Sequence, residues 1–577
     1  MPSHATQRAP APVEEHYDAV IVGSGFGGAV TAARLADPGR DVLVLERGRA
    51  YPPGSFARSP RELSRAFWDP AQGLHGLFEV WRFRSLDAVC ASGLGGGSLI
   101  YANVLIPKDE RSFVHEDLAG GGRECWPIGR ADLEPHYERV WEGLRPQRFP
   151  TTEPYASIPK AGAMQEAARS LGLPAERPEL AVLFAASDHE PPVPGAPVLG
   201  ENLHKLPRST CRLCGECDIG CNVGAKNTLD YTFLSDARRA GAHLRTCCEV
   251  RTIEPLDSRA GGYRIGYRQH LELAAATPGG ELLDPVAEPW RIVTAQTVVL
   301  AAGAIGSTRL LLANRGALPG ISRALGTRVS ANGDAIAWVR DASRRTAGGA
   351  KEPRHLDPSR GPVITTSITV SEGRSQSGRG FRIQDAGAPL VADWFWEALE
   401  LPKLPWRLRR TIVRSLREAI AGRPDTNLSA ELAQLFSDES STLLPLLGMG
   451  RDVPDGRYVL EDGRLELDWS SAPSEAHYEA VEQGFRAIAA ALGGDLLTSP
   501  GKWLSRTTTV HPLGGAPMAD DPRHGVVDPY GEVFGFPGLF VADGAAMPGP
   551  VGANPGYTIA AFADRVADRI LEGTPAP

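Results

Sequence analysis

A histidine near the end of the chain is the first residue that could do catalytic chemistry. His511 stands in the run TVHPLGG over residues 509–515, among small and apolar neighbours. A neutral imidazole can accept a proton near pH 7, and adjacent glycines let another molecule come close. His511 is therefore a candidate general base, although a lone histidine in such a setting is more often structural.

A glycine turn near the start of the chain predicts a nucleotide site. The β-branched stretch 19–22 runs into GSGFGG over residues 23–28, and an apolar helical stretch, 29–35, follows. Gly23, Gly25 and Gly28 fill the GxGxxG positions, which allow a tight turn, a close approach to a pyrophosphate and close helix packing, respectively. The positive N-terminal end of the predicted helix would face the phosphates.

Glu46 completes this unit. The second predicted strand, 41–45, ends directly before Glu46. At that place a carboxylate can accept hydrogen bonds from a ribose diol and repel the 2′-phosphate of NADP. The unit predicts a bound dinucleotide, and by itself it fits NAD and FAD equally well.

A second glycine-rich turn, GLGGG over residues 93–97, leads into SLIYANV, 98–104. A turn without Cβ atoms lets the backbone approach a flat or charged ligand. A flexible loop is the alternative, but such a loop rarely ends in an apolar run. We therefore predict a second set of cofactor contacts, at Gly97, Asn103 and Val104.

Four of the eight cysteines are crowded into a C-x2-C-x2-C-x3-C run, formed by Cys211, Cys214, Cys217 and Cys221. This is the ligand spacing of bacterial ferredoxins, except that Asn222 replaces the proline after the last cysteine. In two-cluster ferredoxins the fourth cysteine binds the other cluster, so Cys247 or Cys248 could replace Cys221 here. The run predicts an iron–sulphur cluster, a structural zinc ion or a set of reduced thiols, and the spacing leaves all three open.

Length and charge narrow the class of protein. A chain of 577 residues is too long for one compact core, so we expect two or more domains. The net charge of −8 gives no support for nucleic-acid binding. The first 16 residues, rich in Ala and Pro, lack the apolar core of a signal peptide, and no stretch has the roughly 20 apolar residues of a membrane helix. We expect a cytoplasmic protein with a disordered tail at 1–16.

The remaining chain predicts two kinds of structure. Residues 126–171 read as largely helical with breaks at prolines, and the strand 298–302 followed by GAIGS indicates a return to the nucleotide-binding sheet. Between about 330 and 502, short alternating runs such as 363–370 and 457–468 are typical of an antiparallel sheet with one exposed face.

One segment of this second region could contact a membrane. Apolar residues recur every fourth position from Leu404 to Ile420, while arginines occupy the other faces. A basic amphipathic helix can rest on an anionic membrane surface, but a helix that covers the sheet with a solvated arginine face explains the pattern more simply.

Taken together, these segments resemble the glucose–methanol–choline (GMC) oxidoreductase family. The resemblance covers nearly the whole chain and rests on segments 23–46, 95–103, 301–312 and 511–554. Within the family, HPLGG at 511–515, Asp543–Gly544 and VGANP at 551–555 are most similar to the cholesterol oxidase branch. An α/β Rossmann-like FAD-binding domain is implied, discontinuous in sequence, together with an α+β substrate domain built on an antiparallel sheet.

The resemblance also implies roles for individual residues. His511 would accept the hydroxyl proton of an alcohol, Asn554 would hydrogen-bond the same oxygen, and FAD would receive the hydride. Asp543 and Gly544 would lie near the ribityl and pyrophosphate part of FAD, and Val250 near its adenine. The implied activity is oxidation of a bulky apolar alcohol, with a role in steroid metabolism if that alcohol is a sterol. Alternatives are an electron-transfer or binding protein without turnover, or a dehydrogenase that passes electrons through a cluster.

Besides the cysteine run, two departures from the family pattern matter. Many relatives place an asparagine four residues after the last glycine of the second turn, whereas Tyr101 stands there and Asn103 follows. The steroid-oxidising branch carries a glutamate for isomerisation, and the corresponding stretch 381–386 offers Gln384, which cannot ionise, with Asp385 beside it. Plain alcohol oxidation is therefore favoured over coupled isomerisation.

The implied domains are an FAD-binding domain of residues 17–125, 225–330 and 503–577, and a substrate domain of residues 126–224 and 331–502 that carries the cysteine-rich insertion near 211–221. The expected partners are a small-molecule alcohol and an electron acceptor, which is oxygen, a quinone or a protein.

Overall fold

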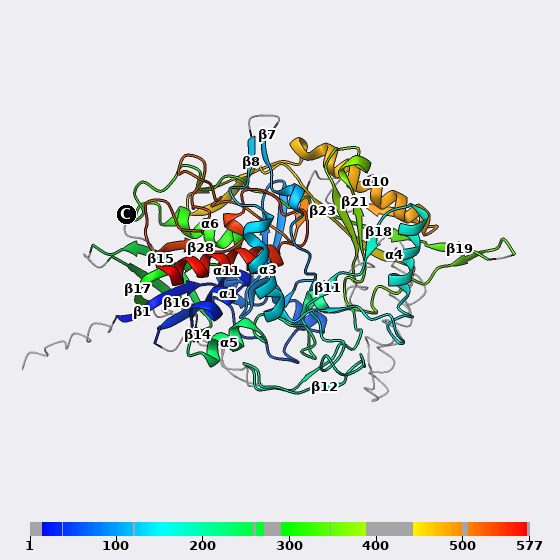
Figure 1. The fold of residues 1–577 in the computed structure, drawn as a ribbon, viewed down its shortest axis with the longest axis horizontal. Coiled ribbons are helices and arrows are strands. Elements are labelled where there is room, and N and C mark those ends of the chain that lie inside the picture. Colours follow the sequence, from blue (N-terminus) through cyan, green and yellow to red (C-terminus); the bar gives the residue numbers. More distant parts are fainter. Residues whose placement is uncertain are drawn as a thin grey trace, which may run out of the picture.

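Two large β-sheets organise the computed structural model, which describes residues 14–36, 39–118, 122–257, 261–270, 290–346, 348–387, 442–498 and 506–573 (Figure 1). The first sheet has the order β14-β2-β1-β17-β16-β15, and β28 also pairs with β17. Its strands are β1 (Glu15–Val22), β2 (Val42–Leu45), β14 (His243–Arg245), β15 (Cys248–Pro255), β16 (Tyr263–Gln269), β17 (Trp290–Leu300) and β28 (Leu539–Val541).

The centre of this sheet is parallel. β1 pairs in parallel with β2 and β17, and β28 runs parallel to β17, whereas β15 and β16 are antiparallel. The carboxyl ends of parallel strands meet at one edge, where ligands bind in open α/β sheets. At this edge Gly23 lies against Ala301, and Gly27 lies against Ala542. Three turns that are far apart in sequence therefore form one surface.

Helices join the two ends of the chain beside this sheet. α1 (Phe26–Leu35) packs against both α11 (Gly556–Glu572) and α5 (Phe233–Arg239), and α11 packs against α3 (Arg130–Leu144). α6 (Gly303–Ala313) follows β17 directly. Figure 1 shows the last helix, α11, in red beside the first helix, α1, in blue.

The second sheet is antiparallel throughout, in the order β10-β21-β22-β23-β18-β26. Helices α4 (Pro159–Ser170) and α10 (Glu475–Ala491) cover one face, where Ala337 and Val339 join a buried apolar cluster with them. Because side chains alternate along a strand, Ile336 and Trp338 lie on the other face. Its strands are β10 (Ala175–Glu176), β21 (Ser367–Val370), β22 (Phe381–Asp385), β23 (Leu444–Gly450), β18 (Ala335–Arg340) and β26 (Asp495–Thr498).

A small sheet links the two ends of the sequence. β27 (Thr507–Thr509) pairs in parallel with β6 (Leu86–Ala91), which is antiparallel to β5 (Phe78–Arg82). Thr509 pairs with Ala88. His511 follows two residues later, so this sheet fixes where its backbone enters the site.

The remaining named elements are short. They are the helix α2 (Pro60–Leu63) and the strands β3 (Trp68–Asp69), β4 (Leu74–His75), β7 (His115–Leu118), β8 (Gly122–Cys125), β9 (Gln147–Arg148), β11 (Glu179–Leu180), β12 (Pro197–Val198), β13 (Arg208–Ser209), β19 (Ser343–Arg345), β20 (Lys351–Pro353), β24 (Arg457–Glu461) and β25 (Arg464–Asp468).

The predicted fold class is confirmed, with several local corrections. β1 begins at Glu15, so the predicted tail 1–16 extends too far, and α1 begins at Phe26 rather than at residue 29. The run 457–468 forms its own hairpin, β24–β25, outside the larger sheet, and only the second half of 363–370 is a strand. The tail residues 1–13 and the predicted amphipathic helix 404–420 lie outside the described residues. The domain boundaries stay a prediction.

Candidate active site

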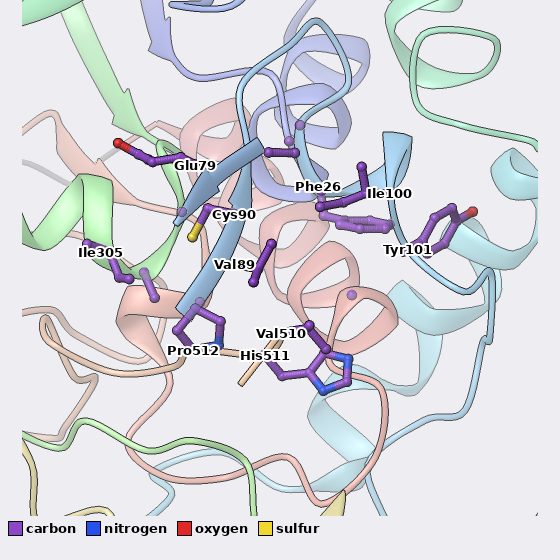
Figure 2. Close-up of a pocket in the computed structure, with 18 of the residues that line it drawn as sticks. Phe26, Glu79, Val89, Cys90, Ile100, Tyr101, Ile305, Val510, His511 and Pro512 are labelled. Carbon is purple, nitrogen blue, oxygen red and sulfur yellow. The ribbon is translucent and has the colours of Figure 1, made fainter. Parts of the chain in front are cut away.

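One cavity of about 700 Å³ brings together residues from both ends of the chain. Ten of the predicted site residues line it: Gly23, Gly25, Glu46, Gly97, Val104, Val250, His511, Asp543, Gly544 and Asn554. Figure 2 shows Val510 and His511 below Val89 of β6, with Phe26 and Tyr101 at the side of the group. The predicted proton acceptor therefore opens onto the same space as the glycine turn.

The positions of the first turn require glycine for different steric reasons. At Gly23, whose φ is +96°, a Cβ would lie 2.4 Å from the Ala301 carbonyl oxygen, and at Gly28 it would lie 2.0 Å from the Gly23 oxygen. A Cβ at Gly25 would meet only the Gly96 Cα, at 3.9 Å. Gly23 and Gly28 are thus required by packing, whereas Gly25 leaves space on the cavity side, as a close approach to a phosphate requires.

Glu46 ties the two glycine turns together. Its buried carboxylate accepts hydrogen bonds from the Ser24 amide (3.0 Å), the Ser24 hydroxyl (2.6 Å) and the Gly48 amide (2.8 Å). The Ser24 hydroxyl oxygen in turn accepts the Gly95 amide at 3.0 Å. Glu46 therefore shapes both turns, in addition to its predicted contact with a ribose.

Gly28 and Asn103 are the two predicted cofactor residues that do not line the cavity. Gly28 serves helix packing, as predicted. Asn103 is fully buried with a φ of +69°, and its carbonyl accepts the Ala181 amide at 2.8 Å. Its side chain approaches Cys217. Burial raises the pKa of the Cys217 thiol, and Asn103 acts in the opposite direction. Asn103 thus points toward the cysteine run.

Asp543 joins the start of α6 to the tail. Its carboxylate accepts hydrogen bonds from the Gly303 amide (2.8 Å), the Ser307 hydroxyl (2.5 Å) and the Ala545 amide (2.8 Å). Burial raises the pKa of Asp543 to about 6, although these hydrogen bonds act in the opposite direction. The side chain fixes the edge where β17 and β28 end.

His511 is oriented by Asp334, a residue that no sequence pattern indicated. The imidazole Nδ1 lies 2.8 Å from Oδ1 of Asp334, which is fully buried. The other carboxylate oxygen accepts the Thr509 hydroxyl (2.8 Å) and the Val510 amide (3.0 Å). An ionised carboxylate only accepts, so the proton sits on Nδ1 and the Nε2 lone pair is left free.

Asn554 is oriented in the same way by Gln384. The side-chain amide nitrogen of Gln384 donates to Oδ1 of Asn554 at 2.9 Å. Gln384 is fully buried on β22, and Asn554 lines the cavity. With its oxygen engaged, Asn554 has its amide hydrogens left to donate. The sequence drew attention to Gln384 only as a residue that cannot ionise.

Asp385 does not join this pair. Its carboxylate accepts the amides of Thr365 (2.9 Å) and Thr366 (2.7 Å), and the fully buried Lys160 ammonium lies 3.3 Å away. Side chains of consecutive strand residues face opposite ways. Asp385 is thus held in a buried ion pair, on the side of the strand away from Asn554.

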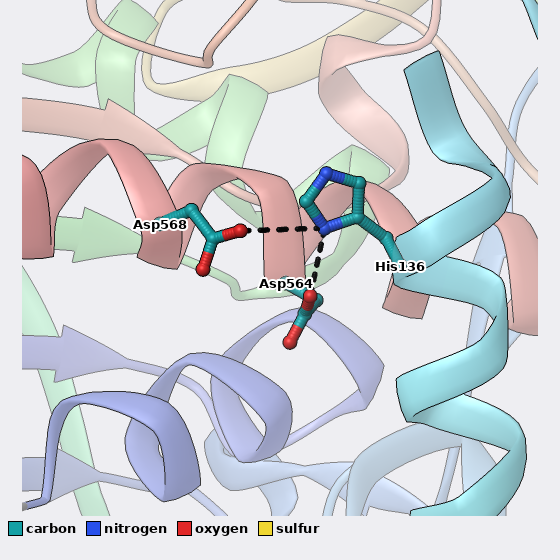
Figure 3. A group of neighbouring side chains, drawn as sticks. All are labelled: His136, Asp564 and Asp568. Carbon is teal, nitrogen blue, oxygen red and sulfur yellow. Dashed lines mark hydrogen bonds and ion pairs between the residues drawn. The ribbon is translucent and has the colours of Figure 1, made fainter. Parts of the chain in front are cut away.

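The four cysteines of the run are free thiols, with Cys211 and Cys217 buried and Cys214 exposed. Among the described residues, the one group of three or more potential ligands within 4.8 Å of one another is His136, Asp564 and Asp568 (Figure 3). No three of the described cysteine sulfurs therefore lie within 4.8 Å of one another.

Arginines already occupy the group in Figure 3. Asp564 forms ion pairs with Arg34 and Arg139, and Arg139 also contacts Asp568 at 2.7 Å. Burial alone would raise the pKa of Asp564, but hydrogen bonds from His136, Arg139 and Arg34 bring it below its usual value. We interpret this group as an ion-pair network that joins α1, α3 and α11.

Comparisons with known proteins agree with this geometry. Two family profiles described as GMC oxidoreductase match residues 194–323 and 462–563, and one described as an NAD(P)-binding Rossmann-like domain matches 21–83. A cholesterol oxidase of Mycobacterium tuberculosis is 30% identical over 96% of this chain and 90% of its own. A cholesterol oxidase of Acinetobacter baumannii is 26% identical over 96% and 94%.

A solved structure supports the fold. Pyridoxine 4-oxidase from Mesorbium loti has a TM-score of 0.56 and 18% identity, and the match covers 97% of this chain and 100% of that one. With nearly full-length relatives, two matching profiles and a cavity that unites their motifs, the chain belongs to the GMC oxidoreductases, FAD-binding enzymes that oxidise alcohols.

Proposed function

We propose that this enzyme oxidises a bulky, largely apolar alcohol, such as a sterol, to the carbonyl compound. The observation that carries the proposal is a pair of side chains that line the same cavity as the glycine turn. Asp334 orients His511, and Gln384 orients Asn554, each through a hydrogen bond. The two relatives named as cholesterol oxidases support a sterol substrate.

The residues present fit FAD. Gly25 and Gly97 border the cavity, and a Cβ at either position would meet no atom closer than 3.9 Å. Gly25 caps α1 without a side-chain hydrogen bond, so the N-terminus of this helix can face a pyrophosphate. Glu46 and Val250 would hold the adenosine end, and Asp543 and Gly544 the ribityl chain. When bound, FAD supplies the acceptor for the hydride that leaves the carbinol carbon.

The chain's own residues manage the proton. The free Nε2 of His511 accepts the hydroxyl proton, and the Asp334 carboxylate stabilises the imidazolium that results. The Asn554 amide donates to the same oxygen and holds the carbinol carbon in a fixed orientation. Asp334 directly precedes β18 and Gln384 lies on β22, and both are buried, which keeps the two donor–acceptor directions fixed before the substrate arrives.

The walls of the cavity favour an apolar substrate. Ile336 and Trp338 reach it from β18, Leu447 from β23, and Val89 and Trp81 from the small sheet. Burying such a surface against a hydrocarbon skeleton contributes about 25 cal/mol per Å². Coupled isomerisation is not part of the proposal, since Gln384 cannot ionise and Asp385 is engaged by Lys160.

Anaerobic mixing of the flavin-loaded protein with sterols, long-chain alcohols and short polar alcohols tests the proposal. We expect bulky apolar alcohols to bleach the flavin absorbance fastest and the short polar alcohols to bleach it slowest. A flavin that stays oxidised with every alcohol would instead indicate an electron-transfer or binding protein. Faster bleaching by short polar alcohols would refute the substrate class alone.

The electron acceptor and the location of the protein remain proposals. The relatives named as oxidases support oxygen as acceptor, and a quinone or a protein is the alternative. Among the described residues, no helix is long and apolar enough to cross a membrane. We propose a cytoplasmic location. Contact with a membrane surface is a further proposal, based on the sequence of residues 404–420.

A further inference from the structure

The cysteine run turns sharply between its cysteines. Leu213, Gly215 and Gly220 have positive φ values of 60°, 66° and 91°, which turn the chain between successive cysteines. The sulfurs of Cys211, Cys214, Cys217 and Cys221 lie within electrostatic reach of one another. Arg58 fixes the loop from outside, through Glu216 (2.8 Å) and the Gly220 carbonyl (2.5 Å).

Two of the four sulfurs accept a backbone amide. The Leu213 amide lies 3.4 Å from Sγ of Cys211, and the Ala225 amide lies 3.3 Å from Sγ of Cys221. Hydrogen bonds to sulfur favour the thiolate and tune the potential of iron–sulphur clusters. The bonds to Cys211 and Cys221 therefore fit a cluster site.

A buried cation stands beside the sulfurs. The Lys226 ammonium, on a residue that is 1% exposed, donates to the carbonyls of Leu99 (3.1 Å), Tyr101 (2.9 Å) and Cys217 (2.7 Å). Negative charge on Cys217 or Cys221 would stabilise this ammonium. A cluster bound by four thiolates is an anion, and Lys226 would compensate part of its charge.

The spacing of the sulfurs argues against a single zinc ion. Zinc bound tetrahedrally by sulfur at about 2.3 Å brings its ligand sulfurs within about 4 Å of one another. No three of the described cysteine sulfurs meet even the wider limit of 4.8 Å. A four-iron cluster binds each sulfur to a different iron, so it holds its ligands farther apart.

The loop also touches the active site. Asp218 and Ile219, between the third and fourth cysteines, line the same cavity as His511, while Cys214 is exposed. We propose that Cys211, Cys214, Cys217 and Cys221 bind a 4Fe–4S cluster that carries electrons from the flavin site to the surface. The electron path rests on the proposed function, whereas the binding site does not.

The electron balance requires a named acceptor. Oxidation of one alcohol to the carbonyl releases two electrons and two protons. The cluster takes and releases one electron at a time, so two passages reduce two equivalents of a one-electron acceptor, such as an iron protein, or one quinone in two steps. The proton accepted by His511 and the second proton leave to solvent or to the quinone.

The test uses the full-length, flavin-loaded protein purified without oxygen and reconstituted with ferrous iron and sulfide. We expect about four iron and four sulfide per chain, and a paramagnetic signal after dithionite reduction. Cys217→Ser should lose both, and Cys125→Ser, outside the run, should keep both, with equal flavin content in the two variants. In Cys214→Ser, electron delivery to a one-electron dye should fall at least tenfold while anaerobic flavin reduction is unchanged.

Flavin-loaded protein with less than half an iron per chain, or with stoichiometric zinc only, would overturn the proposal. So would an unchanged iron signal in Cys217→Ser. The two proposals can fail separately. If the cluster binds but no alcohol reduces the flavin, the proposed function alone is refuted. If the protein takes up no iron during reconstitution but an alcohol reduces its flavin, the cluster alone is refuted.

Discussion

The Asp334→Asn substitution probes the orientation of His511. One carboxylate oxygen accepts two donors, the Thr509 hydroxyl and the Val510 amide, and the other faces Nδ1 of His511. In the variant, the single carbonyl oxygen of asparagine is required by the two donors. Its NH₂ group then faces Nδ1, which must become the acceptor, and the ring proton moves to Nε2. The substitution preserves the shape and removes the base.

The expected cost follows from the loss of this base. General-base catalysis contributes about 10²- to 10⁴-fold, which corresponds to about 2.7 to 5.5 kcal/mol in the barrier. We expect the first-order rate of anaerobic flavin reduction in Asp334→Asn to fall by about that factor, while flavin affinity and melting temperature change little. Asp341→Asn, at an exposed position, is the matched control. A rate in Asp334→Asn within twofold of wild type would refute the tautomer argument.

Three further predictions concern other buried side chains. Gln384→Met removes the hydrogen bond to Asn554, and since such a bond contributes about 0.5–1.5 kcal/mol, flavin reduction should slow about 2- to 12-fold; an unchanged rate would show that Asn554 needs no such support. Burial raises the pKa of Asp452 to about 7, whereas the pKa in the unfolded chain is near 3.9. Between pH 4 and 7 the folded chain therefore holds a proton that the unfolded chain releases. This group makes stability fall as the pH rises through that window. In Asp452→Asn the melting temperature relative to wild type should therefore increase from pH 5 to pH 8, and a constant difference would count against the shift. Because arginines occupy Asp564, a chelator should leave the melting temperature unchanged, whereas Asp564→Asn should lower stability by about 1–3 kcal/mol through the donors left unpaired, and a drop caused by chelator would instead indicate a bound metal ion.

The sequence predicts those parts of the structure that are fixed by local patterns. The glycine turn at 23–28, the predicted strand 298–302 and the tail around His511 each carry a local signal, and their order identifies the family. That is why the Rossmann-like sheet and the two catalytic candidates could be named before their geometry was known.

The partners of these residues have no such signal. Asp334 lies 177 positions before His511, and Gln384 lies 170 before Asn554, so only the packing of the antiparallel sheet against the tail brings them together. Asn103 shows the converse: its place after a glycine turn suggested a cofactor contact, but it does not line the cavity, and its side chain lies near Cys217. The assignment of residues 457–468 to the larger sheet was wrong, because the alternation in this run is equally typical of a separate hairpin.

The most direct test of the account is the rate at which a bulky apolar alcohol reduces the bound flavin in His511→Ala, measured by rapid anaerobic mixing beside wild type. If His511 is the base, the variant should retain its flavin and reduce it about 10²-fold or more slowly. The loss should be smaller for a fluorinated alcohol, because its more acidic hydroxyl depends less on a base. Reduction at the wild-type rate, with flavin fully bound, would contradict the central claim.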